Sequence, residues 1–210
     1  MNLKKQAHPH NDLGYQDFFN NRHKLKMLRL AEIKPSDIFF DLGCGNASIL
    51  IFAVKNFNIK KAIGYENDRI RYKNALKNVE NKHLSERITI CYEDILNANL
   101  READVIFDML PEDEFDFERY QTGIKNGTRL IKHDLPLIGY IADKIDYPFY
   151  RMTFPLREAS NKNQWASHVL GDNNATTKDL WWELFYYENE KHYTKHDINR
   201  CKRILQKRIK

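Results

Sequence analysis

The sequence predicts an α/β fold, in which a seven-stranded sheet is mostly parallel with an antiparallel final strand and carries helices on both faces. Short apolar runs alternate with helical stretches over residues 38–132. Such alternation implies parallel strands joined by right-handed crossovers. Two aromatic, β-prone segments then follow with no convincing helix between them, and strands joined without a crossover pair antiparallel.

The individual elements follow from apolar periodicity and from turn residues, taken in chain order. Apolar residues at helical spacing predict a helix over residues 16–31, ahead of the first strand. The predicted strands cover residues 38–42, 62–65, 88–92, 105–107, 129–132, 150–156 and 181–187. The predicted intervening helices cover residues 49–57, 69–80 and 114–125. A polar, Asn-rich loop over residues 158–178 is expected to join the last two strands.

A chain of 210 residues suggests one domain with additions. We expect an N-terminal helical segment and leading loop over residues 1–36, a ligand-binding domain over 37–190 and a basic C-terminal helix over 191–210. That last segment holds eight Lys or Arg residues against one acid. A packed helix with a basic outer face is the favoured interpretation, and contact between this tail and nucleic acid stays open.

Composition points to an intracellular protein without a metal centre. No stretch of 18 apolar residues predicts a membrane span, and the charged N-terminus lacks the apolar region of a secretory signal. Cys44, Cys91 and Cys201 are widely spaced and odd in number, which indicates a reduced, cytoplasmic compartment. The histidines show no ligand spacing, so no metal site is predicted.

The most informative motif is Asp-Leu-Gly-Cys-Gly at residues 41–45, followed 21 residues after Gly45 by Glu66. Gly43 and Gly45 lack a Cβ, so the turn can take positive φ and let a ligand lie against the backbone. The helix that follows presents its positive dipole end at the same place. Glu66, at the carboxyl end of the next strand, can accept hydrogen bonds from a ribose diol.

The same motif discriminates between nucleotide ligands. A dinucleotide fold would show Gly-x-Gly-x-x-Gly, whereas this chain has Ser48 where the third glycine would stand. Asp41 would repel a pyrophosphate and would attract a cation. S-adenosylmethionine carries an ammonium and a sulfonium, so electrostatics favours this methyl donor.

These residues resemble the class I, seven-strand S-adenosylmethionine-dependent methyltransferases, which have a Rossmann-like sheet. More narrowly, residues 13–188 resemble the non-SET protein lysine methyltransferases of archaea and eukaryotes. The resemblance implies that Asp41 contacts the amino acid end of the donor and that Glu66 holds the ribose hydroxyls. It implies further that Asp94 accepts from the adenine amine. The full set expected to bind the cofactor is Asp41, Gly43, Gly45, Asn46, Glu66, Asp94 and Ile95.

For catalysis the candidates are Asp108, which would steer the substrate ammonium, and Tyr15, in a segment that resembles the archaeal enzymes' loop beside the substrate channel. Asp108 as a helix cap or turn residue is an equally good interpretation. Five acids between Glu112 and Glu118 predict an acidic rim that attracts a basic, lysine-bearing protein. An RNA or small-molecule methyltransferase and a non-catalytic cofactor-binding module are the alternatives.

Overall fold

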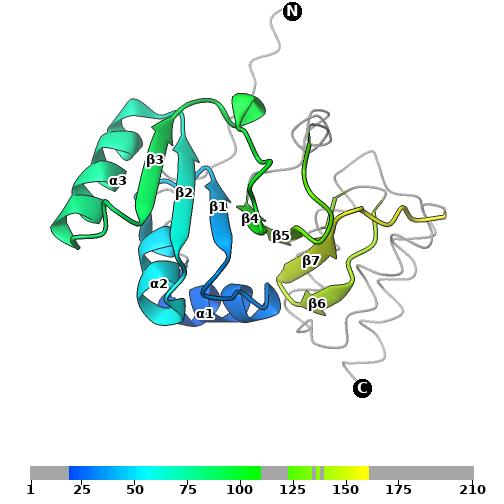
Figure 1. Cartoon of the computed structure of the whole chain (residues 1–210). Helices are drawn as coiled ribbons and strands as arrows, with labels where there is room; N and C mark the ends of the chain where they lie inside the picture. Colours follow the sequence, from blue (N-terminus) through cyan, green and yellow to red (C-terminus); the bar gives the residue numbers. More distant parts are fainter. Residues whose placement is uncertain (1–18, 110–122, 134–135, 138–139, 161–210) are drawn as a thin grey trace, which may run out of the picture.

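The computed structural model describes residues 19–109, 123–133, 136–137 and 140–160. These residues form a seven-stranded sheet with the order β3-β2-β1-β4-β5-β7-β6 (Figure 1). The strands are β1 (Ile38–Leu42), β2 (Lys61–Glu66), β3 (Ile88–Tyr92), β4 (Val105–Asp108), β5 (Arg129–His133), β6 (Lys144–Asp146) and β7 (Phe149–Thr153). The helices are α1 (Asn21–Leu30), α2 (Ser48–Phe57) and α3 (Arg69–Asn81), with a short 3₁₀ turn, η2, at Ile95–Asn97.

The pairing of the strands confirms the predicted fold class. Strands β1 to β5 are parallel to one another, and β7 runs antiparallel to both β5 and β6. The hairpin β6–β7 closes one end of the sheet (Figure 1). The order of the parallel strands in the sheet changes direction between β1 and β4, and the carboxyl ends of β1, β2 and β4 lie beside one another. Ligands bind at this position in open α/β sheets.

Two late elements differ from the prediction. The strand expected over residues 150–156 covers Phe149–Thr153. It pairs antiparallel with β5 and with the three-residue β6, which the sequence did not predict. Strand β6 is short and partly exposed, so it carries no apolar run. The expected strand at 181–187 lies outside the described residues, as does most of the helix expected at 114–125. Residues 123–125 of that helix are not helical.

Each face of the sheet carries its own apolar core, because successive side chains along a strand point to opposite faces. One core joins Phe39 and Phe107 to buried residues of the three helices, which gather along one side of the sheet (Figure 1). The other core joins Phe40 and Ile106 to residues of the segment that contains η2 and to Tyr150. No helix in the described ranges is long and apolar enough to cross a membrane.

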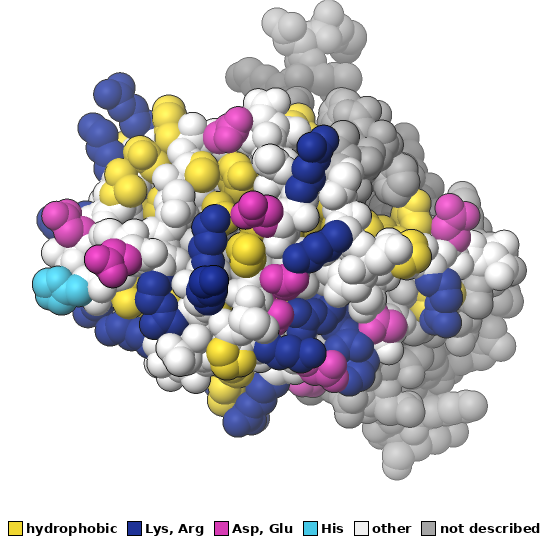
Figure 2. Space-filling view, in the orientation of Figure 1, with side chains coloured by type: hydrophobic (Ala, Val, Ile, Leu, Met, Phe, Trp, Pro, Cys, Tyr) yellow, Lys and Arg dark blue, Asp and Glu magenta, His cyan; other side chains and the backbone are white. Residues whose placement is uncertain are grey.

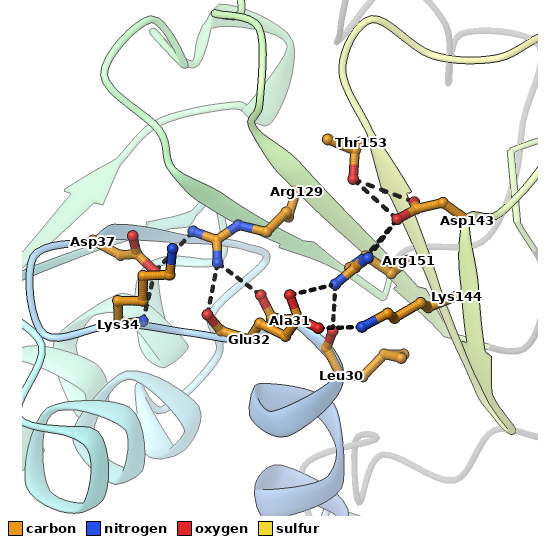
Figure 3. Close-up of polar contacts among 10 residues, drawn as sticks. All are labelled: Leu30, Ala31, Glu32, Lys34, Asp37, Arg129, Asp143, Lys144, Arg151 and Thr153. Carbon is orange, nitrogen blue, oxygen red and sulfur yellow. Dashed lines mark hydrogen bonds and ion pairs between the residues drawn. The ribbon is translucent and has the colours of Figure 1, made fainter.

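Two arginines fasten the end of α1 to the sheet at the amino ends of the strands, in a group we call the α1 clamp (Figure 3). Arg129 donates to the carbonyls of Ala31 and Glu32 at 2.9 and 2.7 Å. Its second nitrogen pairs with Asp37 at 2.8 Å. Arg151 bridges Glu32 at 3.1 Å, and Lys144 pairs with the same carboxylate. These donors satisfy carbonyls that a helix end leaves without partners.

Candidate functional site

The predicted ligand-binding residues that the structure describes lie at the carboxyl ends of the central strands. Asp41 is the fourth residue of β1, and its neighbours across the sheet are Gly64 of β2 and Phe107 of β4. Glu66 ends β2 and Asp108 ends β4. Strand β1 leads directly into the turn that contains Gly43 and Gly45, so three carboxylates and the glycine turn share one edge.

The glycine turn has the backbone conformation that the sequence predicts. Gly43 and Gly45 have φ angles of 78° and 55°, in the left-handed region that side chains disfavour. Ala47 also has a positive φ, 64°, although it is not glycine. The amides of Gly43 and Cys44 both donate to the Tyr65 carbonyl at 2.9 Å, which fastens the turn to β2.

The start of α2 is tied to its surroundings through Asn46. Its side-chain oxygen accepts from the Ser48 amide at 3.0 Å, and its carbonyl accepts from Asn78 of α3 at 3.0 Å. Asn46, included in the predicted cofactor set, therefore holds the turn between two helices. The Ser48 amide, at the first residue of α2, is thus paired with the Asn46 side chain.

Close packing of α2 and the glycine turn against β2 depends on Gly64, in the middle of β2. A Cβ on Gly64 would lie 2.6 Å from the Cys44 sulfur and 2.7 Å from a methyl carbon of Leu50. This strand glycine supplies the close approach that the third glycine supplies in a dinucleotide motif. Gly64 is not among the predicted site residues, although a glycine inside an apolar strand is a signal of such a close approach.

Glu66 has a structural role beyond the one predicted for it. One carboxylate oxygen accepts from the Gly45 amide at 2.9 Å, and the other accepts from the Asp68 amide at 2.9 Å. Glu66 is buried, with 5 % of its surface exposed. The carboxylate is thus held in one orientation at the glycine turn. Each carboxylate oxygen has a second lone pair, so hydroxyl donors can still bind.

Asp41 is a buried carboxyl group whose pKa is strongly raised. It is 2 % exposed, and its Oδ2 has no hydrogen-bond partner among the described residues. Burial first, and then the negative charges of Glu66 and Asp108, raise the pKa of Asp41 to about 8. A buried carboxylate without a partner is costly, and a cation placed beside it would remove that cost. The geometry therefore suits a positively charged ligand.

The thiol of Cys44, in the same turn, is kept unreactive by burial and by the same negative charges. Burial raises the pKa of its thiol, and the nearby charges of Asp41 and Glu66 raise it further. The reactive form of cysteine is the thiolate. Cys44 therefore stays protonated and serves as packing against β2.

Asp108 makes a contact that the sequence analysis missed. Its Oδ2 lies 3.4 Å from the ammonium nitrogen of Lys132 on β5, and both side chains are almost fully buried. The two residues are direct neighbours in the register of β4 and β5. Asp108 is therefore half of a buried ion pair. The available signal was a lysine inside the apolar strand at 129–132, at the end where the predicted site lies.

Of the remaining predicted residues, the structure describes Asp94 and Ile95. Asp94 is exposed after β3, and its Oδ1 accepts from the Leu96 amide at 2.9 Å at the start of η2. Ile95 is half-buried and packs against the core on that face. Tyr15, the acids at 112–118 and the C-terminal segment at 191–210 lie outside the described residues.

These observations fit a ligand of the kind that the sequence predicts. A cation fits the unpartnered oxygen of Asp41, and a diol fits the oriented carboxylate of Glu66. The exposed Asp94 and the half-buried Ile95 offer a polar and an apolar contact beyond the end of β3. Within the described ranges no three His, Cys, Asp or Glu side chains are arranged to hold a metal ion.

Comparisons with known protein families and with known sequences agree with each other. Residues 23–107 match a family described as "Methyltransferase domain". A protein-lysine N-methyltransferase of Saccharolobus islandicus is 33 % identical over 117 residues, which cover 55 % of this chain and 73 % of that protein.

Two solved structures share the fold. One is an RNA methyltransferase from Salinibacter ruber in complex with S-adenosyl-L-homocysteine, at a TM-score of 0.62 and 24 % identity, covering 68 % of this chain and 97 % of that one. The other is a candidate tRNA (m1A22) methyltransferase from Streptococcus pneumoniae, at a TM-score of 0.57 and 18 % identity, covering 89 % and 99 %. At these identities the likeness concerns the fold.

Proposed function

Because this chain belongs to the class I S-adenosylmethionine-dependent methyltransferases, we propose that it methylates the side-chain amine of lysine in a basic protein. The observation that carries the lysine specificity is the 33 % identity with a protein-lysine N-methyltransferase, over 73 % of that relative.

The residues proposed to hold the cofactor are those that the sequence predicted. Asp41 would bind the cationic amino acid end, and Glu66 the ribose hydroxyls. Gly43, Gly45 and Asn46 would keep the backbone of the turn against the ligand. Asp94 would accept from the adenine amine, with Ile95 against the ring. When bound, S-adenosylmethionine supplies an electrophilic methyl group on a positively charged sulfur.

The role of the protein in the transfer is alignment and charge control. An attacking lysine must be neutral, although its free pKa is about 10.4. Burial of an incoming amine and the positive sulfur of a bound donor would both lower the pKa of that amine. Its proton can leave to water, so no strong general base is required. Positioning of the amine in line with the methyl group contributes several kcal/mol.

We propose Asp108 as the residue that orients the substrate amine. Lys132 pairs with its Oδ2 at 3.4 Å, which would restrain the orientation of the carboxylate. Tyr15 is proposed as a wall of the substrate channel. Phe19, four residues later, packs against Phe107 of β4 and Phe149 of β7, with ring centroids 5.8 and 5.6 Å apart. Phe19 is thus anchored beside Phe107 of β4, the strand that ends in Asp108.

The test is transfer of a labelled methyl group from S-adenosylmethionine into host lysate, with separation of protein from RNA and mass spectrometry of the labelled products. The proposal expects the label on lysine side chains of basic proteins. The matched control is Asp41→Asn, which keeps the size of the side chain and should abolish the label. Label confined to RNA or to small molecules would overturn the lysine specificity. Cofactor binding without any S-adenosylhomocysteine formation would indicate a non-catalytic module.

A further inference from the structure

Helix α3 carries cations on its outer surface that pair with nothing else in the described structure. Arg69, Arg71, Lys73 and Lys77 are all exposed, against a single carboxylate, Glu80, in the same helix. None of the four makes an ion pair or side-chain hydrogen bond within the described ranges. Arg69, Lys73 and Lys77 are spaced four residues apart, so they follow one side of the helix over two turns.

Apolar and aromatic side chains lie beside these cations where α3 begins and β3 ends. Ile70 is 72 % exposed and Tyr92, the last residue of β3, is 55 % exposed. The Tyr92 ring lies 5.2 Å from that of Tyr72 on α3, tilted by 38°, so the two elements present one aromatic surface. Leu96 of η2 is 52 % exposed. Figure 2 shows hydrophobic side chains next to Lys and Arg at this end of the molecule.

We propose that this surface, which we call the α3 ridge (Arg69, Ile70, Lys73, Lys77 and Tyr92), binds single-stranded nucleic acid. Unpaired cations along a helix suit a phosphate backbone, and an exposed tyrosine suits stacking of an unpaired base. The ridge meets the proposed cofactor residues at Tyr92, which is the neighbour of Glu66 in the register of β2 and β3, and its other members lie on α3. The proposal does not depend on the lysine specificity.

Two other partners fit the ridge less well. An anionic membrane would require the apolar residues of α3 to form one stripe. Ile70 and Leu76 are six residues apart, which places them about 120° apart around the helix. An acidic protein would pair with the cations but would leave the exposed ring of Tyr92 without a specific role. Nucleic acid uses both features.

The test measures anisotropy of a labelled oligouridylate of about 12 nucleotides, within the usual range of site sizes, with the full chain. In the variant Lys73→Glu/Lys77→Glu we expect at least a tenfold loss of affinity at about 50 mM salt, and a salt slope about 1.4 units shallower, since each phosphate contact contributes about 0.7 on single strands. Tyr92→Leu should lose roughly tenfold with the slope unchanged, because it removes stacking and no charge.

The matched control is Lys55→Glu/Lys60→Glu, which changes the net charge equally at exposed lysines outside the ridge. The control should retain most of the affinity. Equal losses in the two double variants would overturn the proposal, because binding would then follow overall charge or another basic segment. A ridge variant that keeps its oligonucleotide affinity but loses binding to phosphatidylserine vesicles or to polyglutamate would also overturn it. Retained cofactor affinity in the lysine double variant, and an unchanged thermal unfolding transition in Tyr92→Leu, show that the ridge variants are folded.

Discussion

Replacing Asp41 by Asn should change how the stability of the ligand-free protein depends on pH. The pKa of Asp41 is raised from 3.8 to about 8 in the folded chain. Between these values the folded state keeps a proton that the unfolded state has released. Stability of the wild type therefore falls as pH rises through this window, by about 1.4 kcal/mol per pH unit. Asn does not ionise, so the variant lacks this contribution.

The magnitude follows from the width of the window. Between pH 5 and pH 8 the wild type should lose about 4 kcal/mol relative to Asp41→Asn. For a chain of this size that corresponds to a relative shift of roughly 8–16 °C in Tm. Groups that titrate in both proteins cancel in the difference, so the pH-independent cost of burying the amide does not disturb the comparison.

Thermal unfolding of both proteins at pH 5 and pH 8, without ligand, measures this double difference. Asp94→Asn is the control, because it removes an exposed carboxylate from the same edge of the sheet and should follow the wild type at both pH values. A difference in Tm between Asp41→Asn and wild type that is the same at pH 5 and pH 8 would refute the assignment of a buried, protonated Asp41.

Four further substitutions, in three comparisons, test the site and its support. Glu66→Gln replaces a carboxylate oxygen that accepts a hydrogen bond from a backbone amide. We therefore expect the free energy of unfolding in urea to fall by about 1–3 kcal/mol and cofactor binding, measured by calorimetry, to be at least tenfold weaker. Unchanged cofactor affinity would contradict the ribose role. Gly43→Ala should cost about 1–2 kcal/mol because of its positive φ, whereas Ala47→Gly at a similar φ should stay within about 1 kcal/mol of wild type; equal losses would exclude backbone strain. Arg129→Met in the α1 clamp should cost about 3 kcal/mol in unfolding and leave cofactor affinity unchanged, because the clamp lies at the opposite edge; a parallel loss of affinity would show that the edges are coupled.

The strands and the motif could be predicted from sequence because local patterns specify them. Apolar runs bounded by turns located β1 to β5 within one residue at most ends, and the spacing from Gly45 to Glu66 placed both at one sheet edge. Positive φ at Gly43 and Gly45 followed from the lack of a Cβ in a strand–helix turn. These features depend on a few neighbouring residues.

The features that were missed depend on contacts between distant segments. Lys132 faces Asp108 only because β4 and β5 are paired in a particular register. Strand β6 is held by β7 and has no pattern of its own. The use of both Glu66 oxygens by backbone amides, and the unpartnered oxygen of Asp41, arise from the folded geometry. A single sequence gives the residue type at such positions but not the partner.

Proton release on cofactor binding tests most directly whether Asp41 provides the negative charge for the ligand. Calorimetric titration of S-adenosylmethionine at pH 7, in buffers with different ionisation enthalpies, reports the number of protons released. With a pKa of about 8 in the free protein, Asp41 is mostly protonated at this pH and must ionise to pair with a bound cation. The account predicts release of nearly one proton by the wild type and none by Asp41→Asn. Tight binding by the wild type with no proton release would contradict it.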